Sequence, residues 1–266
     1  MVGTILVREA LRRACYLLGD LSPVQFQRHR ETELVDFLND GALAIVSYMP
    51  TAGAMLATVK LKPGALQSIE SIPAAHVKLP DGSAPTAAVR GINFLHGTRN
   101  RGATGLVNGR ALRVVDRRML DATDPDWQAD SRAKTEISAY MFDPVLPKYF
   151  WVVPPVHATT EVWMEAALNA EPMRVPNSGE PGAELYPADG SSQAVIPLPD
   201  TYLDDLVNYI VARANMNASE WADADKALYF TSLFTASLNA KVAAATGTNP
   251  NLRRLPFAAE PVAVAS

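Results

Sequence analysis

Four aspartates within ten residues form the densest group of potentially reactive side chains in this 266-residue sequence: Asp121, Asp124, Asp126 and Asp130. Closely spaced carboxylates can bind calcium or act as the acid and base of a glycosidase. This run lacks the central glycine and the terminal glutamate of a helix-loop-helix calcium site. The sequence around Pro125 is more typical of a turn followed by a helix cap, so the simpler interpretation of the run is structural.

The other reactive residue types are isolated. No two of the four histidines are spaced as a helical metal-binding pair, and the one cysteine, Cys15, excludes an intrachain disulfide and a cysteine-rich metal site. The sequence has no Gly-x-Ser-x-Gly motif, no phosphate-binding loop and no dinucleotide-binding glycine motif. We therefore predict no catalytic, cofactor-binding or metal-binding residues, no cofactor and no enzymatic activity.

Arginines are segregated from acidic residues. Residues 90–118 contain seven arginines and one acidic residue, Asp116, whereas residues 119–130 contain four aspartates and no basic residue. One interpretation is an ion-paired, solvated surface within one subunit. Another is a head-to-tail contact, in which the basic strand of one subunit meets the acidic loop of its neighbour, and such contacts close into rings. A third, binding of DNA phosphates, lacks interleaved aromatic residues.

Aromatic residues gather at Tyr149, Phe150 and Trp151, shortly before two consecutive prolines. Alternation along a strand would bury Phe150 and expose Tyr149 and Trp151, or the reverse. An exposed aromatic residue is a candidate interface anchor. The predicted inter-subunit or tail interface consists of Arg113, Arg117, Arg118, Asp121, Asp124, Asp126 and Trp151.

Composition limits the class of protein. With 48% apolar residues, the chain can bury a substantial core, and its net charge of −4 argues against a globally basic nucleic-acid binder. Charged side chains interrupt the N-terminal apolar pattern, and the most apolar late stretch, residues 227–238, is too short to cross a bilayer. We expect a soluble chain without a targeting or membrane segment, assembled in a reducing cytoplasm.

The elements that must position these residues change type along the chain. Helical periodicity predicts a helix from Ile5 to Leu18 with Thr4 as its N-cap, and a second from Thr32 to Met49. Two more helices are expected after residue 200 and from Trp221 to about Ala245, with Ser219 as the N-cap of the last. Between residues 52 and 196, short segments separated by proline and glycine predict an antiparallel β-rich domain.

The predicted fold is therefore α+β. The N-terminal and C-terminal helix pairs form a four-helix bundle, and the β-rich domain is inserted between them. The expected boundaries are 1–51 for the first hairpin, 52–197 for the β-rich domain and 198–245 for the second hairpin. Residues 246–266 contain three prolines and no amphipathic period, which predicts an extended C-terminal arm.

The order and spacing of several motifs resemble those of the head-to-tail adaptor (connector) proteins of tailed bacteriophages, particularly short-tailed phages. The resemblance spans residues 5–241, whereas segments 97–107 and 172–193 and the residues after 246 depart from it. The motifs are ELVDFLNDG at 33–41, GRALRVVDRR at 109–118, DPDW at 124–127, FDP at 142–144 with the aromatic strand that follows, and LPDTY at 198–202.

This resemblance implies a structural virion protein that is not an enzyme. Such adaptors form a ring, usually of twelve copies, that joins the portal to the tail or nozzle and lets DNA pass through its lumen. The implied partners are further copies of the chain, a portal protein, a tail or nozzle protein, and DNA bound without sequence specificity, with no membrane. The implied location is the head-tail junction of the virion, after assembly in the host cytoplasm.

The resemblance also gives the C-terminal arm a role, because in relatives this arm often docks into the portal. The implied portal-binding residues are Leu252, Arg253, Arg254, Leu255 and Phe257. A mixture of arginines and apolar residues suits a segment that becomes ordered on binding, and a frayed terminus is the alternative.

Two other functions remain open at this point. One is a different tail component, such as a nozzle or tail-completion protein, which the sequence hardly separates from an adaptor. The other is a carbohydrate-active enzyme, which requires Asp124 and Asp126 to converge in a cleft. Aspartates exposed on a turn would argue against the enzyme.

Overall fold

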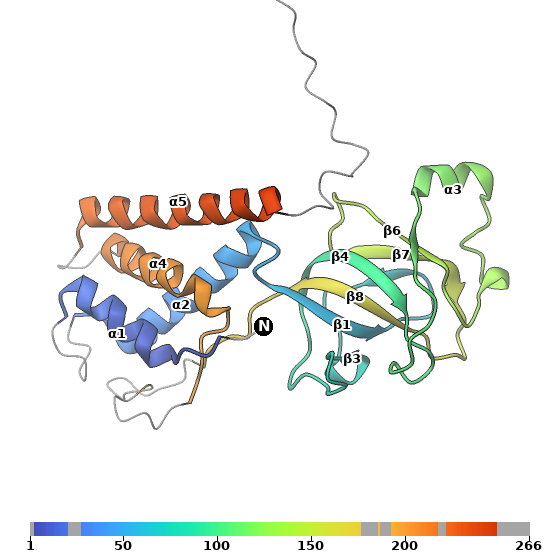
Figure 1. Cartoon of the computed structure of the whole chain (residues 1–266), viewed down its shortest axis with the longest axis horizontal. Coiled ribbons are helices and arrows are strands. Elements are labelled where there is room, and N and C mark those ends of the chain that lie inside the picture. The colour runs from blue at the N-terminus through green and yellow to red at the C-terminus, as the bar shows by residue number, and fades with distance from the viewer. Residues whose placement is uncertain (1–2, 21–27, 177–185, 187–192, 218–221, 249–266) are drawn as a thin grey trace, which may run out of the picture. The chain divides into compact units, whose positions relative to one another are not determined.

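The computed structural model of the chain describes residues 3–20, 28–176, 186, 193–217 and 222–248 (Figure 1). The chain divides into two compact units. The helical unit comprises residues 5–41, 176–196 and 200–266, and the β unit comprises residues 1–4, 42–175 and 197–199. The fold class is α+β, as predicted, with five α-helices and two four-stranded sheets among the described residues.

The helical unit begins with α1 (Val7–Leu18), which starts two residues later than predicted and ends as predicted. Its N-cap is Leu6, whose side chain makes no capping hydrogen bond, so the cap predicted at Thr4 is wrong. Gly19 ends the helix with φ +72° and donates its N–H to the carbonyls of Cys15 and Tyr16. The buried face of α1 follows the helical period: Val7, Ala10, Leu11, Ala14, Cys15 and Leu18.

Helix α2 (Glu31–Tyr48) lies within one residue of its predicted bounds at both ends. Its first part, residues 31–41, belongs to the helical unit. Gly41 normally costs about 1 kcal/mol in a helix interior. A Cβ at Gly41 would lie 2.9 Å from Cδ1 of Tyr209, so close packing against the tyrosine ring requires glycine at this position.

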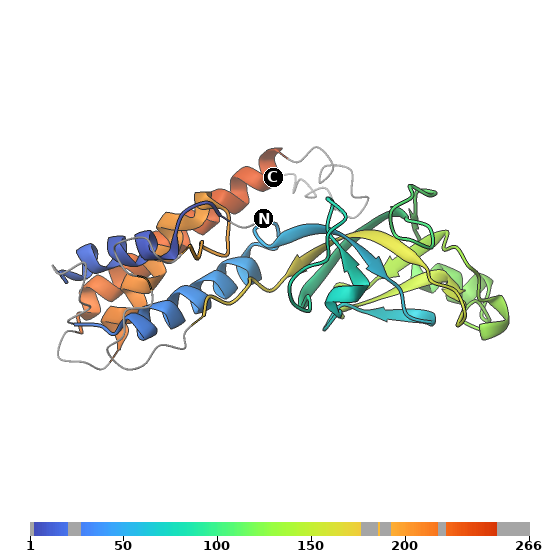
Figure 2. The ribbon, with the colours of Figure 1, turned by 90° about the horizontal axis from the view of Figure 1, so that it is seen from below.

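The last two helices lie side by side in Figures 1 and 2. Helix α4 (Leu203–Met216) follows a 3-10 turn at Asp200–Tyr202, and it also contacts α1. Helix α5 (Ala224–Thr248) packs the ring of Phe234 on that of Tyr209, with 5.2 Å between the centroids. The predicted cap Ser219 and first helical residue Trp221 lie outside the described residues. A complete four-helix bundle stays a prediction.

The β unit contains two sheets where one small antiparallel sheet was expected. The first has the order β3 (Val77–Lys78), β1 (Ala54–Lys60), β8 (Trp163–Ala170), β4 (Gly91–Asn100). The second has the order β2 (Gly64–Ser68), β7 (Tyr149–Val156), β6 (Ala139–Phe142), β5 (Arg113–Val114). Neighbouring strands are antiparallel except β5 and β6, which are parallel. Single 3-10 turns lie at Ala74–His76 and Asp130–Arg132.

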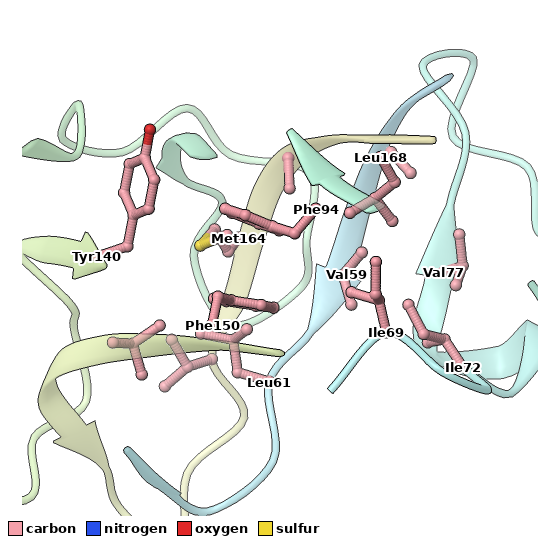
Figure 3. Packing of buried hydrophobic residues seen from close by; sticks show 14 of the residues in the cluster. Val59, Leu61, Ile69, Ile72, Val77, Phe94, Tyr140, Phe150, Met164 and Leu168 are labelled. Atoms are coloured by element: carbon pink, nitrogen blue, oxygen red, sulfur yellow. The ribbon is translucent and has the colours of Figure 1, made fainter. Parts of the chain in front are cut away.

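The main core of the β unit draws side chains from both sheets (Figure 3). Phe94 of β4 stacks on Phe150 of β7 with 4.2 Å between ring centroids, and meets Tyr140 of β6 edge-on at 5.6 Å. Burial of each such large side chain contributes about 1.5–3 kcal/mol. The two sheets are therefore joined by an aromatic centre.

A second, smaller core lies against the second sheet. It consists of Ala65, Trp127, Met141 and Trp151, and Leu120 packs against it. Leu120 belongs to α3 (Arg117–Thr123), a helix that the sequence did not predict. Asp116 caps α3 by accepting hydrogen bonds from the N–H groups of Arg118 at 2.8 Å and Met119 at 3.3 Å. The second sheet thus has buried side chains on both faces.

Candidate assembly interface

The arginine-rich stretch of residues 90–118 lies along β4, β5 and the start of α3. Four of its seven arginines pair with acidic residues of the same chain, as expected for an ion-paired surface within one subunit. These pairs are Arg90 with Glu171 (3.4 Å), Arg99 with Glu165 (3.7 Å), Arg101 with Glu165 (2.5 Å) and Arg117 with Asp121 (3.5 Å). The other three arginines of the stretch have no part in these ion pairs.

Arg110, Arg113 and Arg118 are exposed, and their guanidinium groups form no ion pair within the part of the chain that the structure describes. Each of two of them precedes an exposed apolar residue in the sequence, Val114 after Arg113 and Met119 after Arg118. Arginine and methionine are enriched at protein interfaces. The three exposed guanidinium groups have the chemistry to contact an acidic partner.

Two aspartates of the run, Asp121 and Asp124, have partners within the chain. Asp121 pairs with Arg117 and also accepts a hydrogen bond from Nε1 of the buried Trp127 at 2.7 Å. Asp124 pairs with Arg132 at 2.8 Å. Asp121 and Asp124 would have to exchange these partners to bind a neighbouring subunit's arginines, so the predicted basic-to-acidic contact between subunits stays a prediction.

Asp124 and Asp126 do not form the acid pair that a glycosidase requires. Asp126 is exposed, and Asp124 is engaged by Arg132 on an irregular segment after α3. The geometry is the exposed turn that argues against a carbohydrate-active enzyme. Among the described residues, no group of three or more His, Cys, Asp or Glu side chains is arranged to hold a metal ion.

Trp151 is 7% exposed, so the predicted alternation along this strand is wrong. Phe150 and Trp151 point to opposite faces of β7, but each face is buried, the first in the main core and the second in the smaller one. Arg117 covers the Trp151 ring, with its guanidinium carbon 4.4 Å from the ring centroid. Arg117 therefore holds α3 against the sheet, and any interface role of Trp151 stays a prediction.

The predicted portal-binding segment, Leu252 to Phe257, lies outside the described residues. No helix among the described residues combines the length and the apolar character needed to span a bilayer.

Sequence reasoning missed one extended surface, the outer face of α5. The chain has no charged residue between Lys226 and Lys241. The exposed positions of this stretch include Leu228, Tyr229, Ser232, Leu233, Thr235, Ala236 and Ala240. The absence of charged residues over about four helical turns could have revealed this surface in the sequence, since an ordinary solvated helix face carries charged side chains.

Residues 6–254 match the model of a family described as SU10 adaptor protein, and the match extends through both compact units. None of the curated proteins matches the chain.

Proposed function

Because the chain belongs to the SU10 adaptor protein family of bacteriophage structural proteins, we propose that it forms a ring joining the portal to the tail or nozzle. DNA passes through the lumen of this ring without sequence-specific binding. The observation that carries the proposal is the family match over residues 6–254. The proposal includes the twelve-fold ring, the short-tailed phage type, the four-helix bundle and the boundaries 1–51, 52–197, 198–245 and 246–266.

The outer face of α5 supports assembly. A helix of 25 residues is about 37 Å long, and most of the exposed side of α5 is uncharged. Designed soluble surfaces carry about 25–35% charged residues. Leu228, Tyr229 and Leu233 expose apolar area at the N-terminal end of this face. A continuous uncharged face of this length suits burial against another protein.

The exposed arginines support a second contact. Arg113 and Arg118 are available for an acidic surface of a neighbouring subunit or tail protein, and Arg110 lies a few residues before them. Their charge also makes the surface favourable for passing DNA, whose phosphates attract arginine regardless of sequence. The candidate interface keeps Arg113, Arg117, Arg118, Asp121, Asp124, Asp126 and Trp151 as its predicted members.

The proposed portal contact is tested by removing the C-terminal arm. Purified full chain should co-sediment with cognate portal rings, and negative-stain images should show an added ring of density. Deletion of residues 247–266 should abolish co-sedimentation while leaving the far-UV circular dichroism spectrum helical. Deletion of residues 258–266 is the matched control, because it keeps Leu252 to Phe257 and should bind as the full chain does.

Two results would contradict the proposal at different points. Undiminished binding after deletion of residues 247–266 would remove the role of the arm. Portal rings that never bind the full chain, or that carry a single copy without annular contacts, would remove the ring adaptor itself.

A further inference from the structure

Two surface features lie toward opposite ends of β4. The first is the loop of residues 101–109, which follows β4 and exposes Leu106 and Val107 at its tip by 59% and 63%. The second is a surface pocket of about 250 Å³, which we call the Phe142 pocket. Its lining includes Asn93, Phe94, Phe142, Asp143, Pro144 and Pro147. Most of the 101–109 loop lies in the segment 97–107 that departs from the family resemblance, whereas the pocket includes the FDP residues 142–144 that carry it.

The 101–109 loop is held in place at its base and in its middle. At the base, the N–H of Asn100 donates to the carbonyl of Arg110 at 2.9 Å. In the middle, Gly105 has φ +73° and packs so closely that a Cβ there would lie 3.0 Å from the Trp163 ring. The two apolar tip residues are therefore presented on an ordered support, and their docking costs little conformational entropy.

The Phe142 pocket is also preformed. The N–H of Phe94 donates to the carbonyl of Pro147 at 2.8 Å, which ties the turn after β6 to β4. Asp143 orders that turn by accepting the N–H of Val145 at 2.9 Å. A cavity of about 150 Å³ is enough for a benzene-sized group, so this pocket has room for a leucine or valine side chain.

The two features complement each other in charge but are separated within one chain. Asp143 is the charged residue of the pocket lining, and Arg110 next to the loop forms no ion pair within the described parts of the chain. Phe94 and Asn100 are six residues apart along β4, on the order of 15–20 Å. A contact between the loop tip and the pocket therefore joins two copies through different surfaces of each.

We propose that the tip of the 101–109 loop of one copy inserts into the Phe142 pocket of the next copy, with Arg110 facing Asp143. This inference rests on the proposed ring, because a repeated head-to-tail contact closes into a ring when its rotation closes. Stable interfaces bury about 800 Å² per partner. The loop contact therefore sets the register between neighbouring copies, while larger surfaces such as the outer face of α5 supply most of the buried area.

Disulfide trapping tests the contact in the full chain. A variant that carries both Val107→Cys and Asn93→Cys is oxidised in two samples. One contains the free chain at high concentration, and the other contains the chain bound to cognate portal rings. A disulfide needs Cα atoms within about 7 Å, so the two new cysteines cannot pair within one chain. Cys15 is buried and gives a clean background. We expect a ladder of covalent dimers, trimers and larger species on a non-reducing gel.

Mixing single variants tests the head-to-tail arrangement. Each chain with one introduced cysteine should stay monomeric on the gel when oxidised alone, whereas a mixture of the two chains should give dimers and nothing larger. Adding Leu106→Asp to the double-cysteine chain should lower the cross-linked yield at least tenfold. Leu66→Asp, at another exposed leucine of the β unit, is the matched control and should leave the ladder intact.

Several results would overturn the inference. These are the absence of a ladder in both arms of the experiment, equal cross-linking by Val107→Cys alone, or an unchanged ladder with Leu106→Asp. Portal co-sedimentation of the same samples separates this inference from the proposed function. Binding to portal rings without a ladder refutes the loop contact alone, and a ladder without portal binding refutes the adaptor role alone.

Discussion

Replacing Lys241 with methionine should lower the free energy of unfolding of the helical unit by about 3 kcal/mol. Lys241 of α5 forms an ion pair with Asp205 of α4, whose side chain is only 1% exposed. The same ammonium group donates to the carbonyl of Thr201 at 2.7 Å and lies 4.7 Å from the centroid of the Tyr202 ring. Lys241 is thus the main charged link between the two helices.

The magnitude follows from what the substitution leaves behind. Removal of one partner of a buried ion pair costs about 3–5 kcal/mol, because the other charge stays buried without compensation. Asp205 lies in the first turn of α4, where the helix dipole still stabilises a carboxylate, so we place the cost at the lower end. Urea unfolding at pH 7, followed by circular dichroism at 222 nm, measures it.

Two further variants make the prediction specific. Lys226→Met removes an exposed lysine from the same helix and should change stability by no more than about 0.5 kcal/mol. Asp205→Leu combined with Lys241→Met removes both charges and should recover most of the loss. A cost below about 1 kcal/mol for Lys241→Met, or a double variant no better than the single one, would refute the reasoning.

Two other predictions concern single side chains. Burial, with the nearby carboxylates of Asp20 and Glu31, raises the pKa of the Cys15 thiol to about 12. The folded chain should therefore react with a thiol reagent at pH 8 at least about 100-fold more slowly than the guanidinium-unfolded chain, and equal rates would contradict the burial. Its stability should also fall as the pH rises above about 9, where the unfolded thiol loses its proton first. Arg117→Ala should lower the free energy of unfolding by about 0.5–1 kcal/mol, because it removes the contact with the Trp151 ring. Urea unfolding followed by tryptophan fluorescence measures this loss. An equal loss in Arg118→Ala would count against the contact.

The long helices could be predicted from the sequence because their signals are local. The apolar spacing of α1 and its glycine end point, and the apolar spacing of α2 before Pro50, lie within single stretches of chain. Strand β4 has no such signal. Its pairing with β8 shifts register at three places, and the resulting bulges remove the alternation on which strand prediction depends. Helix α3 has only seven residues and no fully buried side chain to mark it.

The candidate interface was only partly accessible from the sequence. The segregation of charge was visible, but the choice of partners was not, since Glu165, on a strand more than 60 residues away, pairs with Arg99 and Arg101. The burial of Trp151 depends on a second core that contains Trp127, and Leu120 of the unpredicted helix α3 packs against this core. Alternation alone assumes that one face of a strand meets solvent, and this strand has no such face at that position.

The side chains on the outer face of α5 also govern how a free chain behaves before it meets a partner. The second half of this face has small exposed residues: Ala236, Ala240 and Ala243. Leucine at these positions would be equally uncharged but would expose more apolar surface. Small side chains expose little apolar surface area, so nonspecific association of free copies through this face has little favourable free energy. They also bring no tightly hydrated ions that must be stripped of water on docking. We therefore expect free copies to stay apart through this face, and stable binding to require a partner whose shape matches it along its whole length.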